Sequence, residues 1–356
     1  MRAFLLITDP LSYRGVLDSL RPWVDIEPVV LPLQGKPSSK SGFIARRLWM
    51  ELRYTPRVTR LLCRRDQPTM LLCSTNQFSA LLAGKLCRYL GIRAKIYLFN
   101  LYLFGQAYDL HGLSQRRVVK IVLKYLLAQP VGLFVTSPNE VPYYRRLSPG
   151  AQIAYFPYAA IDVSYVPEDS VQLGDFVFVG GYTNRDYSVV VEAARRFEDT
   201  QFVLACSSLN QIPSRLPPNV QVHRDADPVT FHTLMAGSRC VVVPLIANVG
   251  SSGQMVALAA KQLGKLTIYA DYPPIAQYFT DGEDGLAYRP GDLDDLCGKL
   301  DCCLRDSARV LSMAARSRER YLRDFSVPSF YARIVDHFLT FAGIEHSTEV
   351  SVPMSS

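Results

Sequence analysis

Two short loops in the C-terminal half carry the residue types that bind phosphate groups. The first follows the apolar run at 176–179 and reads Gly180-Gly181-Tyr182-Thr183-Asn184-Arg185. Glycines let a polyanion approach the backbone closely, and the free N–H groups at a helix start attract negative charge. Arg185 would add a bidentate phosphate contact, with Asp186 holding its side chain. A tight structural turn, with Arg185 in a surface salt bridge, is the alternative interpretation.

The second loop reads Gly250-Ser251-Ser252-Gly253-Gln254 and opens an apolar helical run. Two hydroxyls, two glycines and helix-start amides favour a nest for a diphosphate or for sugar hydroxyls. An ordinary helix N-cap is the alternative. Because the two loops follow strands of one domain, each strengthens the phosphate interpretation of the other.

Other site classes find little support in the sequence. There is no Gly-x-x-x-x-Gly-Lys-Ser/Thr, no Gly-x-Gly-x-x-Gly opening the first half, and no Gly-x-Ser-x-Gly. The eight cysteines are scattered through apolar context and the five histidines lack metal-ligand spacing. We therefore expect reduced core cysteines, no metal site and no cofactor.

The elements that must position these loops form two series of short apolar strands separated by helices. Such series imply parallel sheets covered on both faces. We predict strands at 3–8, 26–33, 70–73, 95–99, 133–136 and 153–156, then at 176–179, 202–206, 220–223, 240–244 and 266–270. The sequence thus predicts two doubly wound Rossmann-like domains facing a central cleft, with ligands beyond the carboxyl ends of the strands.

Length and composition agree with two globular domains. The chain has 356 residues, of which 49% are hydrophobic and 20% charged. No run approaches the roughly 18 apolar residues of a spanning helix, and the apolar run at 3–7 is too short for a signal peptide, so we expect a cytoplasmic protein.

The charge is distributed unevenly, because residues 1–165 hold 22 Lys and Arg against nine Asp and Glu. Much of the excess lies in a predicted amphipathic helix within 42–65, and a second basic helix follows at 116–124. A basic helix carrying tryptophan suits an anionic membrane surface. An ordinary solvated surface helix is the alternative, and a nucleic-acid surface is disfavoured because stacking motifs are absent. The predicted membrane-surface residues are Arg46, Arg47, Trp49, Arg53 and Arg57.

From the two loops onward, the sequence resembles the retaining glycosyltransferases of the GT-B fold, most closely glycosyltransferase family 4 of the polysaccharide-assembly type. The resemblance is clearest over 176–342. The segments that carry it are Phe178–Gly181, Asn184–Tyr187, Gly253–Lys265, Asp281–Leu286 and Pro290–Asp292, with looser similarity at Val135–Glu140 and Phe156–Asp162.

The resemblance implies an acceptor-binding domain at 1–162, a linker at 163–174 and a nucleotide-sugar-binding domain at 175–328. It also implies a helix at 329–344 that crosses back to the first domain, before a disordered tail at 345–356. Aligned on Gly264, the two glutamates usual in the family fall at Ser251 and Ala259, and its usual Arg and Lys fall at Gly181 and Asp186. A histidine that often ends a first-domain strand falls at Asn100.

The resulting hypothesis is a glycosyltransferase that transfers a hexose from a nucleotide-diphosphate sugar to a membrane-associated, lipid-linked or glycan acceptor. Its setting would be cell-surface polysaccharide or glycolipid assembly on the inner face of the cell membrane. Asp281–Gly285 is expected to be a supporting turn, and Arg185 and Asn100 are the catalytic candidates. The donor-binding candidates are Gly180, Gly181, Asn184, Arg185, Arg224, Ser251, Ser252, Gly253 and Gln254.

Two alternatives remain open. The absent carboxylates at Ser251 and Ala259 also fit a catalytically inactive glycosyltransferase-like subunit that binds a partner enzyme at the membrane. A sugar-nucleotide epimerase of related fold is disfavoured because acid/base carboxylates and a cleft histidine are poorly represented.

Overall fold

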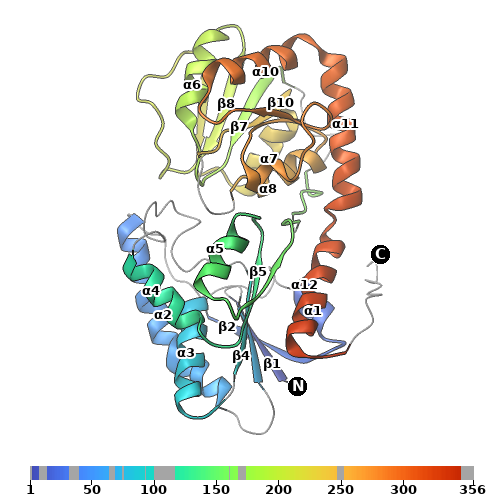
Figure 1. The fold of residues 1–356 in the computed structure, drawn as a ribbon. Coiled ribbons are helices and arrows are strands. Elements are labelled where there is room, and N and C mark those ends of the chain that lie inside the picture. Colours follow the sequence, from blue (N-terminus) through green and yellow to red (C-terminus); the bar gives the residue numbers. More distant parts are fainter. Residues whose placement is uncertain are drawn as a thin grey trace. The chain divides into compact units, whose positions relative to one another are not determined.

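The computed structural model describes residues 2–7, 14–31, 40–63, 69–73, 76–92, 94–99, 117–159, 161–166, 174–246 and 252–345. The chain divides into two compact units, one formed by residues 1–156 with 328–356 and the other by residues 157–327. Each unit contains one six-stranded parallel sheet (Figure 1). The prediction of two doubly wound domains is therefore confirmed.

The first sheet has the strand order β2-β1-β3-β4-β5-β6. Its strands β1, β3, β4 and β5 are mostly buried apolar runs of five or six residues, which is typical of strands covered on both faces, whereas the edge strands β2 and β6 are partly exposed. Helices α2, α3 and α4 lie on one side of this sheet, and α1 and α12 lie on the other (Figure 1). The strands are β1 (Arg2–Ile7), β2 (Asp25–Val30), β3 (Thr69–Cys73), β4 (Lys95–Phe99), β5 (Val131–Val135) and β6 (Gln152–Tyr155). The helices are α1 (Arg14–Leu20), α2 (Lys40–Leu62), α3 (Gln77–Tyr89), α4 (Arg117–Leu127), α5 (Glu140–Leu147) and α12 (Val327–Ala342).

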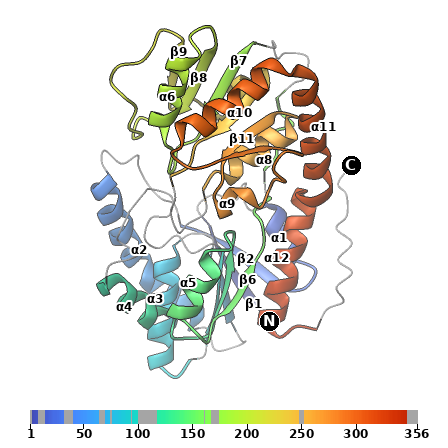
Figure 2. The same cartoon turned by 45° about the horizontal axis from the view of Figure 1, so that its top comes forward.

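The second sheet has the order β12-β11-β10-β7-β8-β9, so β7 pairs directly with β10. Helices α6 and α10 pack beside each other, and α8 packs beside α11 (Figure 2). The strands are β7 (Phe176–Gly180), β8 (Gln201–Cys206), β9 (Val220–Arg224), β10 (Cys240–Val243), β11 (Leu266–Ala270) and β12 (Leu286–Tyr288). The helices are α6 (Tyr187–Arg196), α7 (Pro228–Gly237), α8 (Gln254–Gln262), α9 (Pro273–Ala276), α10 (Leu293–Arg305) and α11 (Ser307–Asp324).

The unit boundaries differ from the predicted ones at residues 157–166. The hydroxyl of Tyr278 donates to the Tyr158 carbonyl at 3.0 Å, and the hydroxyl of Tyr321 donates to the Ile161 carbonyl at 2.6 Å. Residues 157–162, which we predicted in the first domain, therefore pack with the second unit. The start of the predicted linker is held in the same way, because the Val163 N–H donates to Gln262 Oε1 at 2.9 Å.

Helix α2 continues through Pro56 to Leu62, close to the amphipathic helix predicted within 42–65. Proline removes one backbone donor from a helix interior. Threonine hydroxyls add hydrogen bonds on either side of this proline: Thr55 Oγ1 donates to the Glu51 carbonyl at 3.1 Å, and Thr59 Oγ1 donates to the Thr55 carbonyl at 2.8 Å.

The C-terminal helix α12 packs on the first sheet, as the resemblance implies. The hydroxyl of Tyr97 on β4 lies 2.6 Å from Nδ1 of His337, and the Tyr97 ring contacts Phe338 edge-on. Phe338 and Leu339 are fully buried. The first unit is therefore completed by residues from both ends of the chain, and the predicted tail beyond 345 lies outside the described residues.

We predict that Phe338→Ala destabilises the first unit by about 3–5 kcal/mol, because it deletes a fully buried aromatic side chain. Both tryptophans, Trp23 and Trp49, belong to this unit, so tryptophan fluorescence during urea denaturation monitors it selectively. The matched control is Arg333→Ala at an exposed position of the same helix, which should leave the midpoint unchanged. Equal midpoints for Phe338→Ala and wild type would show that α12 does not complete the core.

Candidate active site in the second unit

The two predicted phosphate loops lie where strand order reverses in the second sheet. From β7 the chain moves to β8 on one side, whereas β10 pairs with β7 on the other. The β7–α6 loop and the β10–α8 loop therefore leave neighbouring strands in opposite directions. In open parallel sheets, ligands bind beyond the carboxyl ends of strands at such a switch point.

Direct hydrogen bonds join the two loops. The side-chain Nδ2 of Asn184 donates to Ser252 Oγ at 2.7 Å, and both residues are buried. The Ile246 N–H donates to the Asn184 carbonyl at 3.0 Å, and the Asp186 N–H donates to the Pro244 carbonyl at 2.9 Å. Asn184 adopts a left-handed backbone with φ 54°, and its buried Oδ1 has no hydrogen-bond partner among the residues that the structure describes. The structure thus brings together Asn184 and Ser252, two of the predicted donor-binding residues.

Arg185 is folded inward beneath the glycine turn. Its Nε donates to the Gly180 carbonyl at 3.0 Å, and its Nη1 donates to the Thr183 carbonyl at 2.5 Å. Gly181 has φ 127°, and a Cβ placed there would collide with the Arg185 guanidinium. The backbone conformation at 181 therefore favours glycine, and the Arg185 guanidinium occupies the space into which a side chain at 181 would point.

The charge of Arg185 is buried and has no acidic counterion within the part of the chain that the structure describes. Burial lowers the pKa of its guanidinium to about 10, so the group stays protonated at neutral pH. The predicted contact with Asp186 is absent, since that carboxylate caps helix α6 by accepting from the Val189 N–H at 3.2 Å. A buried cation held only by carbonyl groups leaves positive potential that an anion could neutralise.

The helix starts around this switch point differ in their capping. Aspartate side chains cap α6, α7 and α10, whereas the N-cap residue of α8 is Gly253, and no described side chain caps this helix. Gly253 has φ 82°, a conformation that favours glycine. The opening of α8, with buried Gln254 in its first turn, is therefore the better anion site, whereas the Asp186 carboxylate already occupies the opening of α6. The adjoining candidates Gly250 and Ser251 lie outside the described residues.

The predicted donor-binding residue Arg224 is the last residue of β9, and the loop between β9 and α7 follows it. Its Nη1 donates to the Ser207 carbonyl at 3.3 Å, and the side chain is exposed. Asp225 follows with φ 52°, a second strained backbone at a strand end. Tyr182 links this loop to the glycine turn, because its hydroxyl donates to the Ala226 carbonyl at 3.0 Å. Sequence reasoning missed Tyr182, since a lone tyrosine after a glycine pair carries no pattern.

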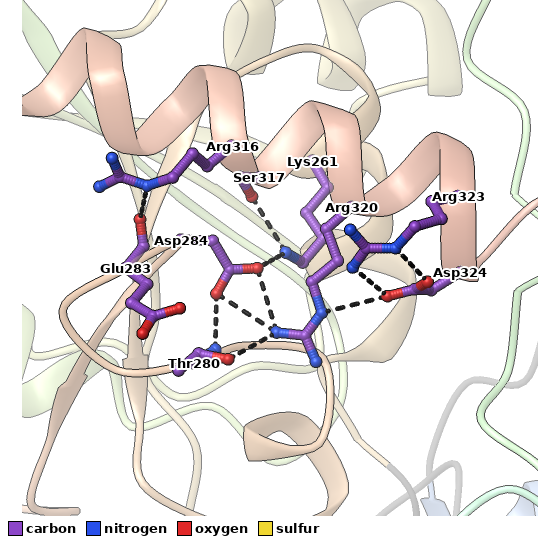
Figure 3. Close-up of polar contacts among 9 residues, drawn as sticks. All are labelled: Lys261, Thr280, Glu283, Asp284, Arg316, Ser317, Arg320, Arg323 and Asp324. Carbon is purple, nitrogen blue, oxygen red and sulfur yellow. Dashed lines mark hydrogen bonds and ion pairs between the residues drawn. The ribbon is translucent and has the colours of Figure 1, made fainter.

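The predicted supporting turn at Asp281–Gly285 is held by a buried charge network (Figure 3). Nζ of Lys261, on α8, lies 2.6 Å from Asp284 Oδ2 and donates to Ser317 Oγ at 3.1 Å. Arg320, on α11, reaches the same carboxylate at 3.2 Å. Lys261 is fully buried, and desolvation lowers the pKa of its ammonium to about 8. The network ties α8 to α11 and to the turn, so the helix that opens at Gly253 has a fixed position.

In the first unit, the catalytic candidate Asn100 lies outside the described residues. The strand that precedes it is braced by Gln77, whose Nε2 donates to the Phe99 carbonyl at 2.7 Å. Asn76, with φ 53°, donates to the Leu31 carbonyl at 3.3 Å. These two side chains fix the carboxyl ends of β2 and β4, and nothing in the sequence had distinguished them from ordinary helix-start residues.

The predicted membrane-surface residues lie on α2. Trp49, Arg53 and Arg57 are exposed, and the Arg53 guanidinium lies 5.5 Å from the centre of the Trp49 ring. The side chains of Arg46 and Arg47 lie outside the described set. Of the described helices, none is long and apolar enough to cross a membrane. Among described residues there is also no group of three metal-ligating side chains.

Comparisons with known proteins place this arrangement in a class. Residues 174–306 match the family model of glycosyl transferases group 1. Sucrose-phosphate synthase from Thermosynechococcus elongatus shares the fold with a TM-score of 0.70 and 14% identity, over 96% of this chain and 99% of that one. Anabaena HepE, solved in complex with UDP and glucose, has a TM-score of 0.66 and 13% identity, over 96% of this chain and 100% of that one. A Rickettsia africae glycosyltransferase has a TM-score of 0.62 and 11% identity, over 96% of this chain and 98% of that one. None of the curated proteins matches.

The chain therefore has the GT-B fold of these glycosyltransferases, and the part of it that matches glycosyl transferases group 1 lies in the second unit. The enzyme class and the fold that the sequence predicted are confirmed. Assignment to family 4 and retention of configuration stay predictions.

We predict that Lys261→Met destabilises the second unit by about 3 kcal/mol, because it removes the buried cation of the Lys261–Asp284 pair and leaves Asp284 with the partly exposed Arg320 alone as its cationic partner. The measurement is urea denaturation followed by far-UV circular dichroism, with tryptophan fluorescence confirming that the first unit is unchanged. Arg196→Met is the matched control, since it removes the exposed Arg196–Asp294 pair of the same unit and should have little effect. Equal losses for the two variants would contradict the structural role of the buried network.

The loss caused by Lys261→Met is expected to depend on pH. The folded-state pKa of about 8 lies below the ordinary value for lysine, so the unfolded chain binds more protons between these values and wild-type stability rises with pH. The methionine variant lacks this contribution. The difference in unfolding free energy should therefore be about 2 kcal/mol larger near pH 9.5 than near pH 7. A difference independent of pH would show that Lys261 does not titrate in this range.

Proposed function

We propose that the protein transfers a hexose from a nucleotide-diphosphate sugar to a membrane-associated acceptor, with retention of configuration. One observation supports this most strongly: a buried arginine lies at the switch point beside the start of α8, and within the described ranges the arginine has no acidic counterion and the helix start has no side-chain cap. Such a site suits the diphosphate of a nucleotide sugar. That HepE is similar in fold and was solved with UDP and glucose agrees with this donor class.

The chemistry required of the site is stabilisation of a leaving group. The bond between the anomeric carbon and a diphosphate oxygen breaks, while a bond forms to the acceptor hydroxyl oxygen, whose proton passes to the departing diphosphate. Negative charge develops on that diphosphate as it leaves. The amides at the opening of α8 and the charge of Arg185 would stabilise it, and Asn184 and Ser252 would keep the two loops in register.

The setting of the reaction is inferred from the first unit. The exposed arginines and tryptophan of α2 suit an anionic surface, which favours a lipid-linked acceptor in cell-surface polysaccharide or glycolipid assembly. The protein would then act at the inner face of the cell membrane.

The donor site is tested by calorimetry with UDP-, GDP- and ADP-sugars. We expect one of these classes to bind, and Arg185→Met to weaken that binding about 10- to 100-fold through loss of a charge-assisted contact. Ser252→Ala provides a second variant, in which the buried Asn184 amide loses its acceptor and affinity should fall about tenfold. Arg196→Met, an exposed change on α6, should bind like wild type.

Wild-type affinity in both site variants would remove these residues from the donor site. If wild type itself binds no sugar nucleotide, the proposal of an active enzyme would be wrong, and the alternative of a catalytically inactive glycosyltransferase-like subunit would take its place. That alternative is favoured by one observation: the position of a usual family glutamate is Ala259, which is fully buried on α8. Where turnover is detected, proton NMR of the released sugar shows whether the anomeric configuration is kept.

We further propose that the reaction needs no metal ion, since cationic and amide groups of the chain would carry the diphosphate. Turnover or sugar-nucleotide hydrolysis should therefore be the same with excess EDTA as without it. Activity that is lost with EDTA and restored by a divalent cation would contradict this.

A further inference from the structure

The outward side of α4 is apolar along its whole length. Val118 is 71% exposed, Ile121 60%, Val122 37% and Tyr125 49%, and their spacing places them on one stripe of the helix. The opposite stripe is also apolar and is buried, with Leu123, Leu126 and Leu127 at 3% exposure or less. A surface helix of a globular protein normally turns polar residues outward. The outer stripe therefore has the composition of a binding surface.

The end of α3 extends this stripe. Leu86, Tyr89 and Leu90 are exposed, and the hydroxyl of Tyr89 lies 2.7 Å from that of Tyr125 on α4. The exposed residues that we call the α3–α4 face are Leu86, Tyr89, Leu90, Val118, Ile121, Val122 and Tyr125.

The two helices are held together by a cation at the rim of this face. Lys85 donates from Nζ to the Ala128 carbonyl at 2.7 Å and lies 4.7 Å from the centre of the Tyr125 ring. The face is therefore a fixed surface and not two independent helices.

The charged side chains that the structure describes on α3 and α4 all have the same sign. Arg88, Arg117 and Lys124 are exposed, and Lys120 is half-buried. Neither α3 nor α4 contains an acidic residue, and between Asp66 and Glu140 the sequence has only Asp109. Two copies of such a face would repel each other, which disfavours self-association. Isolated apolar side chains in a basic frame are equally unsuited to a nucleic acid, whose bases need aromatic stacking.

The neighbouring helix α2 agrees with this charge pattern. It lies on the same side of the first sheet (Figure 1) and exposes Trp49, Leu52 and Arg53. Its acidic residue Glu51 is buried and accepts from the Ser79 N–H at 3.0 Å, so it contributes no exposed carboxylate.

We propose that the α3–α4 face binds the headgroup layer of an anionic bilayer. Valine, isoleucine and leucine would enter the acyl boundary, the paired tyrosines would lie at headgroup level, and the lysines and arginines would contact lipid phosphates. This inference rests on the proposed function for its setting, and it assigns the membrane contact to α4 and the end of α3, beyond the predicted residues of α2.

The test is sedimentation of the full chain with vesicles of phosphatidylglycerol and phosphatidylcholine, against vesicles of phosphatidylcholine alone. Wild type should bind the anionic vesicles and release them at high salt. Ile121→Glu, at an exposed position, should lower partitioning at least tenfold. The matched control is Leu311→Glu on α11 in the second unit, which is 70% exposed and should bind like wild type. Replacing Lys120 and Lys124 together by alanine should weaken partitioning about 30-fold.

Failure of this surface can be told apart from failure of the proposed function. Ile121→Glu should keep the sugar-nucleotide affinity of wild type in solution, because it lies in the other unit from the donor site. No binding of wild type to anionic vesicles, or undiminished binding of Ile121→Glu, would overturn the surface whatever the donor result. Light scattering that shows a dimer dissociated by Ile121→Glu would also overturn it, since the face would then bind a second copy.

Discussion

Strands β7 and β10 pair directly, and the hydrogen bond between Asn184 and Ser252 joins the loops that follow them. This pairing determines how the second unit can bind a ligand. Two loops leave this strand pair in opposite directions, and the Asn184–Ser252 hydrogen bond with two backbone bonds keeps them together. The bond needs a left-handed residue at 184 and a small hydroxyl side chain at 252. The backbone of Asn184 is therefore strained at the place where the ligand is expected. Behind it, the Lys261–Asp284–Arg320 network fixes α8 against α11.

The first unit has a different constraint, because it must keep a large apolar surface on both sides of α4. The inner stripe of α4 and the helix α12 supply the core on opposite sides of the first sheet (Figure 1). On the α12 side, the Tyr97 ring contacts Phe338. The outer stripe is exposed, and we propose that it binds an anionic bilayer, while its Tyr125 also contacts Tyr89 and Lys85 of α3. Arg117, Lys120 and Lys124 lie on the same helix, and the alkyl stems of such side chains can cover apolar surface.

Much of this architecture could be predicted from the sequence. The strand Leu266–Ala270 has the predicted bounds, because a short apolar run is a strong local signal. Helix α11 was not among the predicted elements, since its arginine-rich pattern resembles a solvated segment. The two predicted loops follow neighbouring strands, but the inward fold of Arg185 was not foreseen. The sequence shows that Arg185 is charged, but it does not show that the carbonyls of Gly180 and Thr183 will accept hydrogen bonds from it.

The contact between Gly181 and Arg185 links two positions in evolution. The guanidinium of 185 occupies the space that a side chain at 181 would need, and the backbone at 181, with φ 127°, itself favours glycine. In the resemblance to family 4, position 181 is where relatives usually carry their own arginine. A lineage that moves its arginine from one position to the other must therefore also change the backbone of the turn and the direction of the guanidinium.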